Sequence, residues 1–160
     1  MKKLKIYLDT SVISHLDQQD VPEKMADTIL FWKDVEKEIY DIHISDLTLE
    51  ELDNCYEPKR SFMFKEMSKI QYTKIESTKE SKQLAALYVK QGGLSPSSIN
   101  DARHIAVAAI NNCNAIISWN FSHIVNLRAM MAVDVVNLKE GYSSLRILTP
   151  SMLTAKRREK

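Results

Sequence analysis

The chain has 160 residues, the usual length of one domain, and is long enough to bury a substantial core. Its 22 basic and 21 acidic residues leave a formal net charge of +1, which excludes strong overall attraction to nucleic acid but not a local basic patch. No apolar run reaches the roughly 20 residues that a membrane-spanning helix needs. The two cysteines, Cys55 and Cys113, make neither a disulfide framework nor a metal-ligand spacing, so we expect a reduced, cytoplasmic protein away from membranes.

Strand and helix patterns alternate through the first half of the chain. The apolar run at residues 4–8 predicts a buried strand that ends at Asp9, and a helix follows over residues 10–17. Pro22 suits the first turn of a longer helix that runs to about Lys37. The further elements expected in this half are a strand at 41–45, helices at 48–56 and 60–70, and a strand at 72–75.

The second half continues the same alternation. Its expected elements are helices at 78–90 and 98–113, a strand at 115–119, a helix to about residue 131 and a strand at 133–138. Strands that alternate with helices predict a parallel sheet covered on both faces. We therefore predict an α/β fold, a single-domain three-layer α/β/α sandwich around a mainly parallel sheet. The domain is expected over residues 1–150, followed by a basic, flexible tail at 151–160.

Four polar residues stand where strands end or helices begin. Asp9 ends the first strand and Asn120 ends the strand at 115–119. Ligands bind beyond the carboxyl ends of parallel strands, so these two side chains are expected at one edge of the sheet. Glu51 lies in the first turn of a helix that starts at the same edge. Asp101 begins a helix that follows a loop, so the topology alone does not bring it there.

Carboxylates that converge on one place raise each other's pKa unless a cation lies between them. An oxygen-only set without histidine or cysteine ligands suits Mg²⁺ or Mn²⁺ rather than Zn²⁺. Such an ion can activate a water molecule for attack on a phosphodiester. The pattern therefore indicates metal-assisted phosphodiester hydrolysis.

Helix capping is the structural alternative for the same residues. Thr48-x-x-Glu51 fits a capping box, and Ser98-x-x-Asp101 resembles one. Asp9 and Asn120 can likewise cap the helices that follow them. Capping does not explain Asp9, because the Thr–Ser pair that follows it can cap the next helix alone.

Four segments together resemble the PIN-domain ribonucleases, most closely the VapC-like proteins of bacterial toxin–antitoxin pairs. The segments are IYLDTSVIS at 6–14, ISDLTLEEL at 44–52, NDARHIAVAA at 100–109 and ISWNFSHI at 117–124. No single segment is specific, but the four occur in the family's order with the expected elements between them. The resemblance covers about residues 5–125, which is most of the chain.

The resemblance implies a PIN-like fold and a Mg²⁺- or Mn²⁺-dependent endoribonuclease that cuts RNA. On this reading Asp9, Glu51 and Asp101 hold the metal and Asn120 assists in catalysis. Supporting positions are Thr10, Ser118 and His123. The resemblance also implies a homodimer that a cognate antitoxin protein keeps inactive.

Asn120 departs from the family pattern, which usually has an acid at this position. The amide removes one negative charge, so we also consider a PIN-fold module that binds RNA or a protein partner without cutting. A third interpretation is a phosphatase that uses Asp9. A haloacid-dehalogenase-like enzyme needs a second acid two residues later, where this chain has Ser11.

Overall fold

The computed structural model describes the backbone of residues 2–120 and 124–158 and the side chains of residues 2–120 and 124–154. Its centre is a five-stranded sheet in the order β3-β2-β1-β4-β5, with every neighbouring pair parallel. The strands are β1 (Lys5–Leu8), β2 (Asp41–Ser45), β3 (Thr73–Ile75), β4 (Ala115–Ile117) and β5 (Arg146–Leu148). The predicted parallel sheet is confirmed.

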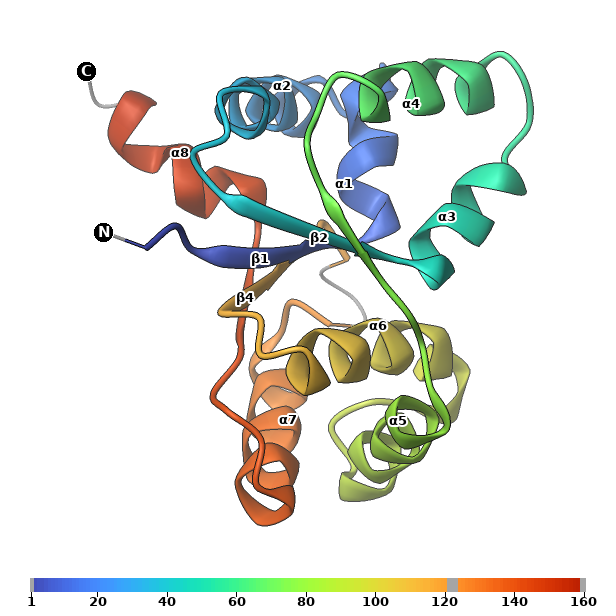
Figure 1. Ribbon diagram of the computed structural model, residues 1–160, viewed down its shortest axis with the longest axis vertical. Helices are drawn as coiled ribbons and strands as arrows, with labels where there is room; N and C mark the ends of the chain where they lie inside the picture. The colour runs from blue at the N-terminus through green and yellow to red at the C-terminus, as the bar shows by residue number, and fades with distance from the viewer. Residues whose placement is uncertain (1, 121–123, 159–160) are drawn as a thin grey trace.

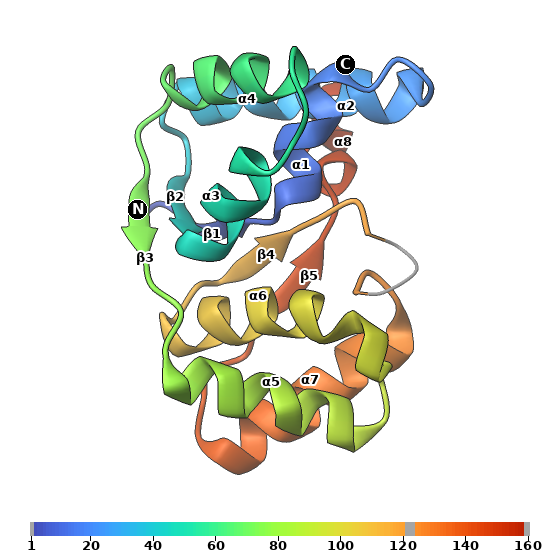
Figure 2. The same cartoon turned by 90° about the vertical axis from the view of Figure 1, so that its right-hand side faces the viewer.

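Helices cover both faces of this sheet (Figure 1). On one face lie α1 (Thr10–Ser14), η1 (His15–Asp17), α2 (Pro22–Glu36), α3 (Asp46–Asp53), α4 (Lys59–Met67) and α8 (Pro150–Arg158). On the other lie α5 (Lys79–Gln91), η2 (Pro96–Ser98), α6 (Ile99–Ile110) and α7 (Leu127–Glu140). Figure 2 shows the same separation after a quarter turn, so the predicted three-layer α/β/α sandwich is confirmed.

The core is divided by the sheet because successive strand residues point to opposite faces. Ile6 and Leu8 of β1 belong to the cluster beneath α1–α4, whereas Tyr7 belongs to the cluster beneath α5–α7. In β4, Ile117 faces the first cluster and Ile116 the second. Burial of each such side chain contributes roughly 1.5–3 kcal/mol. The central strands are therefore held from both sides, and the residues that follow them have fixed positions.

The strand predicted at residues 133–138 is wrong, because this segment lies inside α7. Ala129, Val133 and Val136 are buried at helical spacing, while Val135 and Leu138 on the other side are exposed. The valines at 133, 135 and 136 fit either element, and packing of this segment against α5 makes it helical. The last strand is instead β5, which pairs with β4 after the turn at Gly141.

The segment after residue 150, expected as a flexible tail, continues as α8 up to Arg158. Pro150 stands at its first position, which suits a helix start. Leu153 packs against the cluster beneath α1–α4, and Thr154 is fully buried. These two side chains hold the first turns of the helix against the rest of the domain. None of the described helices combines the length and apolar character needed to cross a membrane.

Candidate functional site

The direction in which successive strands are added to the sheet reverses at β1. From β1 the chain moves outward through β2 and β3, and it later returns to the other side of β1 as β4. In parallel sheets, ligands bind beyond the carboxyl ends of the strands at such a reversal. Asp9 follows β1 there and residues 118–120 follow β4, and the Asp9 N–H donates to the Ile117 carbonyl at 3.0 Å. The two strand ends are thus joined at one edge, the site edge.

Asp9 is 4% exposed, and its side chain points into a set of hydroxyl groups. Its Oδ2 accepts hydrogen bonds from Ser11 Oγ and Ser118 Oγ, both at 2.8 Å. Asp9 occupies the N-cap position of α1, but its side chain makes no capping hydrogen bond. Capping therefore does not explain Asp9, and the hydroxyls fix its carboxylate at the site edge.

Asp101 and Asn120 are in direct contact. The Asn120 Nδ2 group donates to Asp101 Oδ1 at 3.1 Å, and the Asn120 backbone N–H donates to Ser118 Oγ at 3.0 Å. The start of α6 therefore meets the end of β4, although the topology alone did not place Asp101 there. Ser98 occupies the N-cap position of α6 without a capping hydrogen bond, so the predicted box with Asp101 is wrong.

Glu51 reaches the same place from α3 by pairing with His104 of α6. Its Oε1 lies 2.6 Å from His104 Nε2, and the Asp9 Oδ1 atom lies 3.8 Å from the same nitrogen. The predicted capping box of Thr48 and Glu51 is wrong. Ser45 is the N-cap residue of α3, where its side chain accepts from Leu47 N–H.

The pKa values of this pair shift in opposite directions. Burial alone would raise the pKa of Glu51, but the hydrogen bond and charge of His104, with the Thr10 hydroxyl, hold it below its ordinary value. Burial alone would lower the pKa of His104, but the hydrogen bond to Glu51 and the charges of three carboxylates raise it. Those carboxylates are Asp9, Glu51 and Asp101. All three predicted acids therefore act on one imidazole.

His104, Tyr7 and Ser45 are not among the site residues that the sequence predicted. Tyr7 Oη lies 2.6 Å from both His104 Nδ1 and Ser45 Oγ. Burial raises the pKa of Tyr7 far above its ordinary value, so this hydroxyl stays neutral. The sequence did carry a signal for these residues, because their polar side chains stand within buried strands and an alanine-rich helix.

The supporting residues have different outcomes. Ser118 is fully buried and donates to Asp9, and Thr10 lies close enough to Glu51 to lower its pKa. His123 lies outside the described residues. Asp46, a neighbour of Glu51 in sequence, instead accepts the Ser77 backbone N–H at 2.7 Å and joins α3 to the segment after β3.

The donor set fits Mg²⁺ or Mn²⁺ in its chemistry, since it offers three carboxylates and one amide oxygen. In the arrangement described, however, Glu51 is paired with His104 and Asp101 with Asn120. Within residues 2–120 and 124–154, no three acidic, histidine or cysteine side chains are grouped closely enough to hold an ion. A metal at this edge would therefore meet a Glu51 carboxylate with one oxygen held by His104 and an Asp101 carboxylate with one oxygen held by Asn120.

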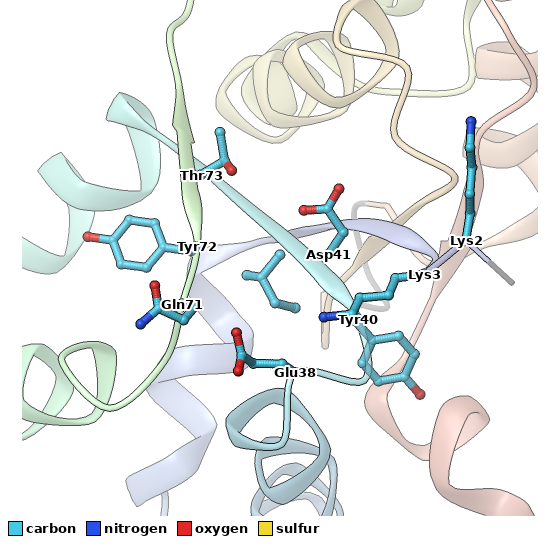
Figure 3. Close-up of a pocket in the computed structure, with 9 residues that line it drawn as sticks. Lys2, Lys3, Glu38, Tyr40, Asp41, Gln71, Tyr72 and Thr73 are labelled. Atoms are coloured by element: carbon cyan, nitrogen blue, oxygen red, sulfur yellow. The ribbon is translucent and has the colours of Figure 1, made fainter.

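A hollow of about 500 Å³ lies at the opposite edge, where β1, β2 and β3 begin (Figure 3). Its lining includes Lys2, Lys3, Glu38 and Asp41, which are exposed. Of the predicted site residues that the structure describes, none lines it. The cluster at the site edge is therefore the better candidate for chemistry.

Comparison with known proteins shows the family to which the chain belongs. A model of the PIN domain family matches residues 6–120. Among solved structures, a chain from the crystal structure of VapBC2 from Rickettsia felis bound to a DNA fragment from their promoter is similar in fold. The TM-score is 0.50 at 14% identity, and the alignment covers 90% of this chain and 97% of that chain. No curated protein matches the chain. The family match spans most of the sequence and ends at Asn120, and the chain belongs to the PIN domain family.

Proposed function

We propose that the chain is a Mg²⁺- or Mn²⁺-dependent endoribonuclease that hydrolyses RNA phosphodiester bonds, and that it is the toxin of a toxin–antitoxin pair. The observation that carries this proposal is that Asp9 and Glu51 both face His104 at the site edge, where Asp101 also meets Asn120 at the end of β4. PIN domains are generally nucleases, which agrees with a cluster of acids at this place.

Hydrogen-bond partners restrain each acid in this proposal, and the partner of Glu51 is His104 at 2.6 Å. Ser11 and Ser118 hold one oxygen of Asp9, and the Asn120 amide holds one oxygen of Asp101. Asp9, Glu51 and Asp101 would hold the metal, with Asn120 assisting. When bound there, the ion would supply an activated water for attack on phosphorus and would stabilise the charge that develops on the phosphate. The hydroxyl and amide donors keep the acids close together before the ion arrives.

The proposed partners are RNA and a cognate antitoxin protein, and the proposed assembly is a homodimer in the cytoplasm. The similar fold in a VapBC2 complex supports the antitoxin partner. The formal net charge of +1 means that RNA attraction has to come from local groups near the site edge rather than from the whole surface.

The test is calorimetric titration of Mn²⁺ combined with a cleavage assay on a mixed RNA pool. Asp101→Asn should abolish both Mn²⁺ binding and cleavage while thermal unfolding stays close to wild type. The matched control is Asp134→Asn, the same change at an exposed position on α7. Full cleavage by Asp101→Asn would contradict the proposal.

The alternative is a PIN-fold module that binds RNA or a protein without cutting. It is favoured by Asn120, which stands where the family usually has an acid and is engaged with Asp101. On this alternative, wild-type protein binds Mn²⁺ weakly and cleaves no RNA, and Asn120→Asp raises the Mn²⁺ affinity. A wild-type protein that cleaves RNA with Mn²⁺ would exclude it.

A further inference from the structure

His104 lies in the middle of the acidic cluster and is 1% exposed. It follows Asp101 by three residues on α6, so the two side chains share one face of the helix. From there its Nε2 atom faces two carboxylates of other elements, Glu51 at 2.6 Å and Asp9 at 3.8 Å. A single buried ring therefore contacts acids from two other parts of the chain.

A series of hydrogen bonds holds the other side of this ring. The Leu47 N–H donates to Ser45 Oγ at 3.1 Å, Ser45 Oγ lies 2.6 Å from Tyr7 Oη, and Tyr7 Oη lies 2.6 Å from His104 Nδ1. Ser45 caps α3, the helix that carries Glu51. The contacts therefore form a closed circuit that leaves α3 at its start, passes through Ser45 of β2, then β1 and α6, and returns to α3 at Glu51.

The direction of the bond between His104 and Glu51 follows from the carboxylate, which can only accept when it is ionised. The hydrogen therefore lies on Nε2 whether the ring carries one proton or two. The Tyr7 hydroxyl serves both states, because it donates to a neutral Nδ1 and accepts from a protonated one. Glu51 is consequently held in the same place in either state.

Glu51 depends on such a restraint more than the other acids do. Its side chain is 43% exposed, whereas the side chain of Asp9 is 6% exposed. A long, exposed side chain samples several rotamers, and only a fixed partner confines it to one. His104 is the fixed partner, since the protein encloses it and both its nitrogens are engaged.

We propose that His104 is a positioning residue for Glu51. Tyr7 and Ser45 fix the imidazole, the imidazole fixes the Glu51 carboxylate, and the carboxylate is thereby kept beside Asp9 and Asp101. The link to catalysis rests on the proposed nuclease function, while the pairing of the two side chains does not.

The kinetic test is a double-mutant cycle with saturating Mn²⁺ on an RNA that the wild type cleaves. His104→Leu keeps an apolar side chain of similar size and removes both nitrogens, and we expect kcat to fall about 30-fold with KM within about twofold. In a Glu51→Ala background the same substitution should change kcat less than about twofold, because no carboxylate remains to be positioned. Losses that multiply in the double variant would overturn the proposal.

Two further variants separate positioning from a general effect on the fold. His104→Gln retains an N–H donor for Glu51, so it should recover part of the activity that His104→Leu loses. His43→Leu is the matched control, because His43 is also buried but lies on β2 outside the circuit. It should leave kcat near the wild-type value. Equal losses in His104→Gln and His104→Leu would contradict the proposed role.

Nitrogen-15 NMR of the histidine rings tests the pairing independently of cleavage. The His104 Nε2–H signal, identified by its loss in His104→Gln, should be protected from exchange and should move in both Glu51→Ala and Tyr7→Phe. A signal that responds to neither substitution overturns the proposal even if the protein cleaves RNA. A responsive signal in a wild type that cuts no RNA refutes the nuclease function and leaves the positioning of Glu51 intact.

Discussion

The two edges of the sheet carry similar residue types in different states. At the opposite edge, Glu38, Asp41 and two lysines surround a hollow and are exposed to solvent. At the site edge, Asp9 and His104 are buried and Glu51 reaches them from α3. An exposed acid is hydrated and interacts weakly with its neighbours, whereas a buried one requires a partner.

This difference indicates which edge of the sheet is suited to catalysis. The hollow offers space, but its charged side chains are exposed and are not held in fixed orientations. The site edge places its acids against hydroxyl, amide and imidazole donors that set their orientation. The candidate site is therefore identified by the hydrogen-bond donors to its acids, and not by the hollow at the opposite edge.

The largest expected effect comes from making the same substitution at each edge. Asp9→Asn should lower the cleavage rate about 10³-fold, about 4 kcal/mol of activation free energy, because it removes a charge from the acidic cluster. Asp41→Asn changes a side chain that is 48% exposed beside His43, and it should alter the rate less than about twofold. Single-turnover cleavage at saturating Mn²⁺ measures both. Similar losses at the two edges would refute the distinction.

Thiol reactivity probes how closely each region is packed. Cys113 lies buried just before β4 near the opposite edge, and burial raises its pKa to about 12. At pH 8 only about one thiol in 10⁴ is then ionised, and it is also enclosed. Cys55, which follows the helix of Glu51 and is partly exposed, should be alkylated by iodoacetamide at least about 100 times faster. Mass spectrometry of peptides over time gives both rates, and equal rates would show that the region around Cys113 opens readily.

Substitutions at two glycines should lower the stability by smaller and unequal amounts. A Cβ at Gly93, in the loop before α6, would lie 2.3 Å from the Arg128 carbonyl oxygen and 2.4 Å from the Ala132 Cβ. Gly93→Ala should therefore cost about 2–3 kcal/mol of unfolding free energy. Gly141 has a φ of +81° and no atom within 4 Å of such a Cβ, so Gly141→Ala should cost only about 1 kcal/mol through backbone strain. Urea denaturation compares them, and a larger loss at Gly141 would contradict the packing described for Gly93.

The parts of the structure that followed from sequence are those that local patterns determine. The apolar run before Asp9 and the alternation at Asp41–Ser45 each predicted a strand where one occurs. The segment at 133–138 was predicted as a strand because its valines fit both periods, and only the buried face of α7 distinguishes them. The three-residue β5 was missed because it depends on pairing with β4.

The candidate site, like the fold, could be predicted only where local sequence patterns determine it. Asp9 and Asn120 followed from strand ends, since topology brings such ends together. The role of His104 did not follow, because a histidine on an alanine-rich helix resembles an ordinary core residue, and its partner Glu51 is 53 residues away in sequence. Local patterns identify which acids reach the edge, but the donors that hold them belong to other elements and emerge only from the fold.

The smallest expected effect is at Asn120, where the amide donates to Asp101. Asn120→Asp removes that donor and places a second carboxylate 3.1 Å from the first, so without metal it should lower the unfolding free energy by about 1 kcal/mol. Added Mn²⁺ should reverse the loss, because an ion that binds only the folded state stabilises it in proportion to its affinity. The measurement is urea denaturation of both proteins with and without Mn²⁺, and Asp134→Asn serves as the surface control. A variant that Mn²⁺ does not stabilise more than wild type would mean that the amide donor, rather than a missing acid, is what this edge requires at residue 120.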